Sequence, residues 1–276
     1  MKYILNSTDK FLFITVEKVA SRFTTRLCDS SRVDVVFLDS TFDKMEFYKR
    51  GKATDDKLER TIKDFKDFLS KTIKKNVVFL YRDPRNRIES GIVQDAFSLF
   101  YNINDYDVSA VFRRMLIKQI TSQYPNQKNL IKSVVDVAQD DVSGLKLKDV
   151  NRDVKKILKD ILEIYISKSN SIGNSGHTQN YLYSYFILLN KNIDMNKVIL
   201  CDIDDRIGFS KMIEQFNIES SGILQTEEAH QIRKDILKEV LEENFNMESL
   251  VNSVISEESI FYDILKSKKN NFTYEQ

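Results

Sequence analysis

Short apolar runs alternate with longer amphipathic patterns along this sequence, and this alternation leaves few folds open to it. Four runs are rich in β-branched and aromatic residues and are typical of buried parallel strands: Phe11–Val16, Val33–Leu38, Val77–Tyr81 and Val198–Cys201. Helical patterns lie between and after them, which favours a doubly wound α/β fold over a helical bundle. We therefore predict a parallel β-sheet flanked by helices, with a helix-rich C-terminal third.

The helices are predicted from apolar residues that recur at intervals of three and four. The pattern is clearest in residues 150–167, where one face carries Val154, Ile157, Leu158, Ile161 and Leu162. The other predicted helices are Ser21–Leu27, Asp55–Lys74, Arg85–Tyr101, Val108–Thr121, Thr178–Asn190, Gly208–Phe216, Thr226–Glu243 and Glu257–Lys266. No domain boundary is evident, so we predict a single domain over residues 1–276, with a frayed tail at 268–276.

Composition narrows the classes of partner. The 276 residues carry a net charge of only +1, which argues against a strongly basic nucleic-acid binder. No apolar run approaches the ~20 residues of a membrane span, and Phe11–Val16 is too short for a signal peptide. The two cysteines, Cys28 and Cys201, have no metal-type spacing and are expected to be reduced and buried. We expect a cytoplasmic protein without a membrane span.

A cation and a hydroxyl follow the third apolar run. The strand ends in Arg82-Asp83-Pro84, and Ser90 lies on the helix that follows. Ligands of open α/β sheets bind at the carboxyl ends of strands, where arginine and serine can grip a phosphate. Alternatively, Arg82 pairs with Asp83 or caps the helix, and Ser90 is a small packing residue. Asp83 is expected to orient Arg82 or to cap the helix, with Pro84 at the first helical position.

A second candidate anion site follows the first run. The segment Glu17–Thr25 brings Lys18 and Ser21 into a turn between a strand and a helix, which is the layout of a phosphate-binding loop. It is not a Walker A loop, because its glycines and its Gly-Lys-Ser/Thr ending are missing. A solvated charged turn is the structural alternative.

Taken together, Lys18-x-x-Ser21 and Arg82-Asp83-Pro84-x-x-Arg87-x-x-Ser90-Gly91 resemble the sulfotransferase family, closest in pattern to carbohydrate sulfotransferases. The resemblance implies a P-loop sulfotransferase-like fold and transfer of a sulfuryl group from 3′-phosphoadenosine 5′-phosphosulfate (PAPS), which leaves PAP. The first loop would hold the 5′-phosphosulfate, and Arg82 and Ser90 the 3′-phosphate. The residues of the first loop that would bind the cofactor are Lys18, Val19, Ala20, Ser21, Arg22, Phe23 and Thr24. Lys18 would also stabilise charge on the leaving oxygen.

The transfer needs a group that takes the proton of the acceptor hydroxyl. His177 opens a predicted helix after a flexible tract, and Asp39 ends the second strand at the ligand edge, so these two are the candidates. His230, the other histidine, is expected at the surface of an exposed helix. The acceptor would be a hydroxylated small molecule or a glycan, and no metal is required.

Two other readings stay open. A P-loop kinase or nucleotide hydrolase would use an acid among Asp202–Asp205 for magnesium, although the Gly-Lys-Ser/Thr ending is missing. A catalytically silent nucleotide-binding protein of sulfotransferase type is the second alternative, because Glu17 and Arg22 depart from the family pattern.

Overall fold

The computed structural model describes the following residues: 2–4, 11–15, 33–37, 76–97, 108–127, 129–131, 148, 150–168, 172–173, 176–178, 198–215 and 228–269. Two compact units share them. The first unit comprises Met1–Pro84, Asn180–Leu224 and Ser256–Gln276, and the second comprises Arg85–Gln179 and Gln225–Ile255. The prediction of a single domain over residues 1–276 stays a prediction. Among the helices that the structure describes, none combines the length and the apolar character that a membrane span requires.

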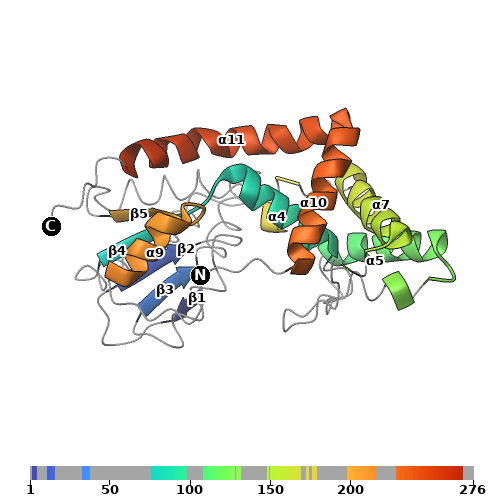
Figure 1. The fold of residues 1–276 in the computed structure, drawn as a ribbon, viewed down its shortest axis with the longest axis horizontal. Helices are drawn as coiled ribbons and strands as arrows, with labels where there is room; N and C mark the ends of the chain where they lie inside the picture. The colour runs from blue at the N-terminus through green and yellow to red at the C-terminus, as the bar shows by residue number, and fades with distance from the viewer. Residues whose placement is uncertain are drawn as a thin grey trace. The chain divides into compact units, whose positions relative to one another are not determined.

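The first unit contains a five-stranded sheet. Its strands are β1 (Lys2–Ile4), β2 (Phe11–Thr15), β3 (Val33–Phe37), β4 (Asn76–Tyr81) and β5 (Val198–Asp202). The spatial order is β1-β3-β2-β4-β5, with β1 antiparallel at one edge and the other four strands parallel (Figure 1). The four predicted strands are therefore confirmed within one or two residues at each end, and β1 is an addition to them.

The topology of this sheet has a switch point between β2 and β4. From β2 the chain passes to β3 on one side, whereas β4 lies on the other side of β2 and leads on to β5. Connections thus leave the β2/β4 boundary in opposite directions. In open α/β sheets, ligands bind at such a point, outside the carboxyl ends of the strands.

Helix α9 (Arg206–Gln215) follows β5 directly and packs against it. Its Phe209 and Met212 are buried, and the Asp205 carboxylate accepts a hydrogen bond from the Gly208 amide at the helix start. The long helix α11 (Phe245–Lys269) ends in the first unit and begins in the second. The prediction Glu257–Lys266 captured only its second half.

The second unit is helical. It contains α4 (Pro84–Phe97, whose first residue belongs to the first unit), α5 (Val108–Gln123), α7 (Arg152–Lys168), the 3₁₀ turn η2 (Gly176–Thr178) and α10 (Glu228–Glu243). The predicted apolar face of α7 is buried throughout, and with α4, α5 and α10 it forms one core. Pro84 opens α4 as predicted. The predicted helices Ser21–Leu27 and Asp55–Lys74 lie outside the described residues, as does all but Thr178 of the predicted helix Thr178–Asn190.

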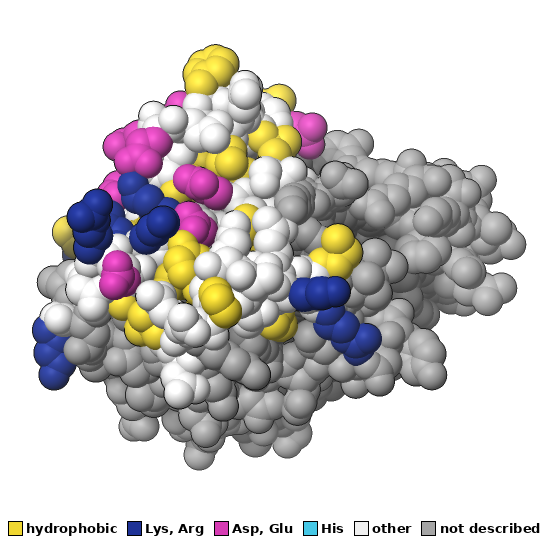
Figure 2. All heavy atoms as spheres, turned by 90° about the vertical axis from the view of Figure 1, so that its right-hand side faces the viewer, with side chains coloured by type: hydrophobic (Ala, Val, Ile, Leu, Met, Phe, Trp, Pro, Cys, Tyr) yellow, Lys and Arg dark blue, Asp and Glu magenta, His cyan; other side chains and the backbone are white. Residues whose placement is uncertain are grey.

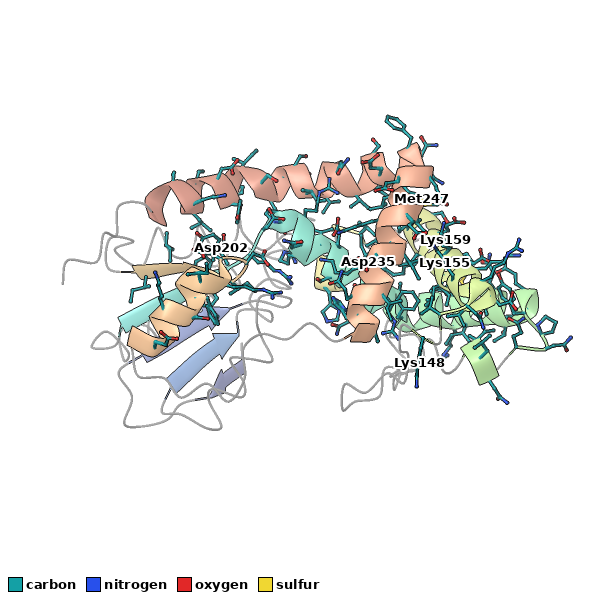
Figure 3. The ribbon with its side chains drawn as sticks, in the orientation of Figure 1. Lys148, Lys155, Lys159, Asp202, Asp235 and Met247 are labelled. Atoms are coloured by element: carbon teal, nitrogen blue, oxygen red, sulfur yellow. The ribbon has the colours of Figure 1, made fainter. Side chains whose placement is uncertain are left out.

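Two helices of this core are also joined across their exposed faces. Lys155 of α7 contacts Glu239 of α10 at 2.8 Å, and Lys159 contacts Glu239 at 3.2 Å and Glu243 at 2.7 Å. Figure 3 shows Lys155 and Lys159 on the side of α7 that faces α10. Figure 2 shows acidic and basic side chains intermingled on the visible face of the described residues. The charges on this face are thus mixed in sign rather than gathered into one basic patch.

Candidate functional site

The carboxyl ends of β2 and β4 lie side by side because the two strands are parallel neighbours, with Ile14 paired to Phe79. The predicted first loop follows β2, and the predicted Arg82 segment follows β4. Both motifs therefore begin at the switch point of the sheet. The loop residues Lys18, Val19, Ala20, Ser21, Arg22, Phe23 and Thr24 lie outside the described residues, as does Asp39 beyond β3.

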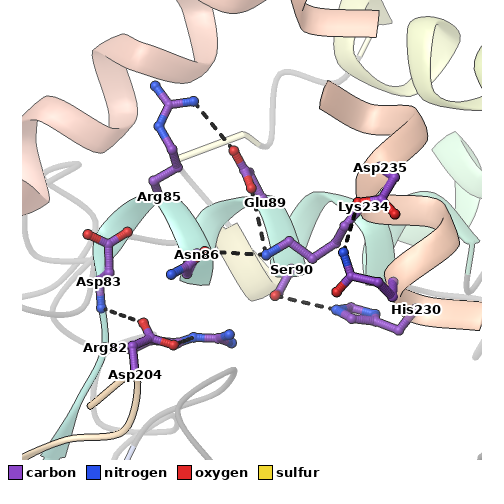
Figure 4. Close-up of polar contacts among 11 residues, drawn as sticks. Arg82, Asp83, Arg85, Asn86, Glu89, Ser90, Asp204, His230, Lys234 and Asp235 are labelled. Carbon is purple, nitrogen blue, oxygen red and sulfur yellow. Dashed lines mark hydrogen bonds and ion pairs between the residues drawn. The ribbon is translucent and has the colours of Figure 1, made fainter. Parts of the chain in front are cut away.

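Arg82 is oriented by an aspartate from the neighbouring strand end. Its Nε donates to Oδ1 of Asp204 at 3.2 Å, and the backbone N–H of Asp83 donates to Oδ2 of the same carboxylate at 3.1 Å (Figure 4). About a fifth of the Arg82 side chain is exposed (22%). Asp204 is thus a partner of Arg82 that the sequence did not suggest. A carboxylate that grips both a side chain and the adjoining backbone fixes the direction in which Arg82 leaves β4.

Asp204 is itself held by the end of β5. The Asp204 backbone N–H donates to Oδ1 of Asp202 at 3.0 Å, and Tyr262 of α11 donates its hydroxyl to Oδ2 of Asp202 at 2.9 Å. Burial and the Asp202 carboxylate raise the pKa of Tyr262 well above its ordinary value, so the phenol keeps its proton. Hydrogen bonds therefore link Tyr262 of α11 through Asp202 and Asp204 to Arg82 at the end of β4.

Tyr81, the last residue of β4, adds an unusual hydroxyl to this cluster. Its side chain is fully buried, with its ring 5.7 Å from that of Tyr262 in an edge-on arrangement. The hydroxyl finds no hydrogen-bond partner among the residues that the structure describes. Burial, and after it the nearby Asp202 carboxylate, raise the pKa of Tyr81, which keeps this hydroxyl protonated too.

The three carboxylates at the end of β5 and directly after it accept hydrogen bonds from other groups of the protein. Asp202 accepts from Tyr262 and from a backbone N–H, Asp204 holds Arg82 and Asp83, and Asp205 accepts from Gly208. Over the described residues, no group of three His, Cys, Asp or Glu side chains is arranged to hold a metal ion. The magnesium role considered for an acid among Asp202–Asp205 stays a prediction.

Ser90 belongs to the second unit, where it is buried on α4. Its Oγ lies 3.4 Å from Nε2 of His230 on α10 (Figure 4). The expectation that His230 is a surface residue is wrong: it is half-buried, and one face of α10 packs into the core. The helical periodicity of α10 is visible in the sequence, but this pattern does not show that His230 faces α4.

A polar network continues along the same two helices. Lys234 of α10 reaches Glu89 at 3.7 Å and Asn86 at 3.5 Å, and Arg85 reaches Glu89 at 3.4 Å. Glu89 and Lys234 are almost fully buried. Their opposite charges compensate each other in a place where a lone charge would be costly.

Side chains from one face of α4 bind His177, the predicted base. Its Nδ1 contacts Oδ1 of Asp95, its backbone N–H donates to Oδ2 of Asp95 at 3.2 Å, and Nη1 of Arg87 donates to its carbonyl at 3.1 Å. Its Nε2 lies 3.2 Å from the amide nitrogen of Gln94. Arg87 is almost fully buried beside this backbone partner.

Gly91 leaves room for this close contact between η2 and α4. A Cβ built on Gly91 would lie 2.5 Å from the His177 carbonyl oxygen, so η2 approaches α4 at a point where only glycine leaves room. Two residues of the motif, Arg87 and Gly91, thus have a structural function in the second unit. Asp95 was missed from the sequence, because no spacing rule links a carboxylate to a histidine 82 residues away.

The comparisons with known proteins add no relative. No family model matches the sequence, and no curated protein or solved structure resembles it significantly. The fold class comes from the structure alone: this is an α/β protein with a largely parallel sheet and a helical second unit.

Proposed function

We propose that this chain is a PAPS-dependent sulfotransferase with a P-loop sulfotransferase-like fold, which transfers a sulfuryl group to a hydroxylated small molecule or glycan. Lys18, with the backbone N–H groups and side chains of Val19–Thr24, would hold the 5′-phosphosulfate. Arg82, with Ser90, would recognise the 3′-phosphate. His177 and Asp39 are the candidates for the base.

The strand order carries this proposal. Two segments that resemble the phosphate-binding motifs of one family lie 60 residues or more apart in sequence, yet they follow the adjacent strands β2 and β4. These strands flank the switch point, where ligands of open α/β sheets bind. A chance resemblance would have no reason to fall on this pair of strands.

The state of Arg82 also supports an anion-binding role. A guanidinium at a strand edge that is aimed by Asp204 needs little reordering when an anion arrives, which lowers the entropic cost of binding. The fork of N–H donors on arginine suits phosphate geometry.

A catalytically silent nucleotide-binding protein is the second candidate. It is favoured by one observation: Asp204 partly neutralises the charge that Arg82 would offer to a phosphate. A P-loop kinase is less well supported, because the first loop lacks a Gly-Lys-Ser/Thr ending and the carboxylates of Asp202, Asp204 and Asp205 are engaged in the contacts described above.

Isothermal titration calorimetry of the full chain with PAP, ADP and Mg·ATP tests the proposal. We expect PAP to bind best and Arg82→Ala to weaken PAP binding roughly 10- to 100-fold, as loss of charge-assisted hydrogen bonds does. Arg82→Lys should fall between the two, since it keeps the charge without the fork.

Arg85→Ala is the matched control, because Arg85 lies three residues away and its contacts are to Glu89 and Asn252. It should leave PAP affinity unchanged. A preference for Mg·ATP, or equal effects of Arg82→Ala and Arg85→Ala, would refute the proposal. PAP binding without sulfuryl transfer to any acceptor would select the silent alternative.

A further inference from the structure

The two ring nitrogens of His177 have partners that agree on a single tautomer. The amide nitrogen of Gln94 can only donate, so Nε2 of His177 must accept its hydrogen bond. In a neutral imidazole the proton is then on Nδ1, and Nδ1 faces the carboxylate of Asp95, which can only accept when ionised. The contacts of the two ring nitrogens therefore both place the proton of the neutral ring on Nδ1.

Asp95 also fixes the position of the ring. It is almost fully buried, and its second oxygen accepts from the His177 backbone N–H at 3.2 Å and from the Tyr165 hydroxyl at 3.4 Å. Arg87 holds the carbonyl of the same residue. The backbone N–H, the backbone carbonyl and both ring nitrogens of His177 thus have partners on α4. About a fifth of the His177 side chain (22%) reaches solvent.

We propose that Asp95 is a positioning residue that holds His177 as the Nδ1–H tautomer, so that Nε2 accepts the proton of a hydroxyl-bearing ligand. In the free chain the N–H of Gln94 occupies the direction from which that O–H would come. A buried carboxylate behind Nδ1 also stabilises the imidazolium that forms. The geometry lies wholly within the second unit.

The chemical step rests on the proposed function. On that function, the acceptor hydroxyl would give its proton to Nε2 of His177 while its oxygen formed a bond to the sulfur of PAPS. The bond from sulfur to the bridging oxygen would break, and PAP would leave with that electron pair. His177 would then be the catalytic residue, Asp95 would act through it, and the base would be His177 rather than Asp39.

Long-range ¹H–¹⁵N NMR of the full chain reads the tautomer directly. The chain has only two histidines, so spectra of His230→Gln assign the His177 signals. We expect the Nδ1–H form in the unaltered chain. In Asp95→Asn the amide oxygen must take the place of Oδ2 to accept the backbone N–H and the Tyr165 hydroxyl. The amide NH₂ then faces Nδ1, which moves the ring proton to Nε2.

This readout separates a positioning role from a merely structural one. An Nε2–H form in the unaltered chain, or an unchanged tautomer in Asp95→Asn, overturns the inference whether or not PAP binds. Absence of PAP binding would overturn the proposed function and leave the tautomer result standing.

Release of sulfate from PAPS, with water as the hydroxyl donor, tests the catalytic role. We expect His177→Gln and Asp95→Asn each to lower the rate at saturating PAPS about 100-fold or more, with PAP affinity retained. Equal rates in the three proteins, including rates too low to detect in all of them, would count against proton transfer through His177.

Discussion

At the scale of single residues, two tyrosine hydroxyls in one cluster have opposite roles. The Tyr262 hydroxyl donates to the buried carboxylate of Asp202, whereas the Tyr81 hydroxyl has no partner among the described residues. Tyr262→Phe should therefore destabilise the protein by about 1–3 kcal/mol, because a buried acceptor loses its donor. Tyr81→Phe should be neutral or slightly stabilising. Urea unfolding of both variants tests this pair, and an equal loss in Tyr81→Phe would show that its hydroxyl is bonded.

Two helical glycines offer a second comparison at this scale. Alanine at Gly91 would place a Cβ 2.5 Å from a backbone carbonyl, and alanine at Gly208 would place one 2.5 Å from the side-chain oxygen of Asp205. A carboxylate end can move, whereas the carbonyl of His177 is held by Arg87. We expect Gly91→Ala to cost about 1–3 kcal/mol and Gly208→Ala clearly less. Thermal unfolding of both variants measures the difference, and similar midpoints would contradict the close approach of η2.

At the level of helices and strands, the contact between α7 and α10 predicts that the stability of the protein depends on pH and on salt concentration. The hydrogen bond from Lys155, and then that from Lys159, lowers the pKa of Glu239 below its ordinary 4.5. As the pH falls, Glu239 therefore takes up a proton in the unfolded chain before it does so in the folded chain. The stabilisation is thus present above pH 4.5 and is lost as the pH falls from there through the lowered pKa.

Glu239→Gln should accordingly cost no more than about 1 kcal/mol at neutral pH and low salt, since the pair is partly exposed. The loss should shrink in high salt and at acidic pH. Glu242→Gln, an exposed glutamate of the same helix, is the control and should change little. Urea titrations at several pH values check the prediction, and a loss that persists at low pH would refute it.

Elements were predictable from the sequence where their pattern was local. The apolar runs gave β2 to β5, and the spacing of Val154, Ile157 and Leu158 gave the buried face of α7. Strand β1 was missed because three residues are too few to form a recognisable run. The first half of α11 was missed as well, and Phe245 at its start is 80% exposed, which blurs the amphipathic pattern.

The candidate site was predictable only in part. A short motif singles out Arg82 and Ser90 as candidates, but their partners Asp204 and His230 come from segments more than a hundred residues away. Tertiary folding brings these pairs together, and no local period encodes them. For the same reason Asp95 could not be linked to His177, nor Tyr262 to Asp202.

At the scale of the whole molecule, binding of PAP should stabilise the chain by mass action. At 100 times its dissociation constant, PAP adds about 2.7 kcal/mol to the free energy of unfolding, which raises Tm by several degrees. If the two units unfold in separate transitions, the transition of the unit that contains β2 and β4 should shift more. Scanning calorimetry with and without PAP measures this, and Arg82→Ala should abolish most of the shift. A shift retained in that variant would place PAP elsewhere.

The antiparallel edge strand has a consequence for how the protein behaves at high concentration. Through β1, the backbone groups of Val35, Val36 and Phe37 are paired within the chain. The border that replaces them is only three residues long, and so short an edge gives a second molecule little backbone with which to extend the sheet. We therefore expect this small strand, which sequence patterns overlook, to disfavour strand-by-strand aggregation at this side of the sheet.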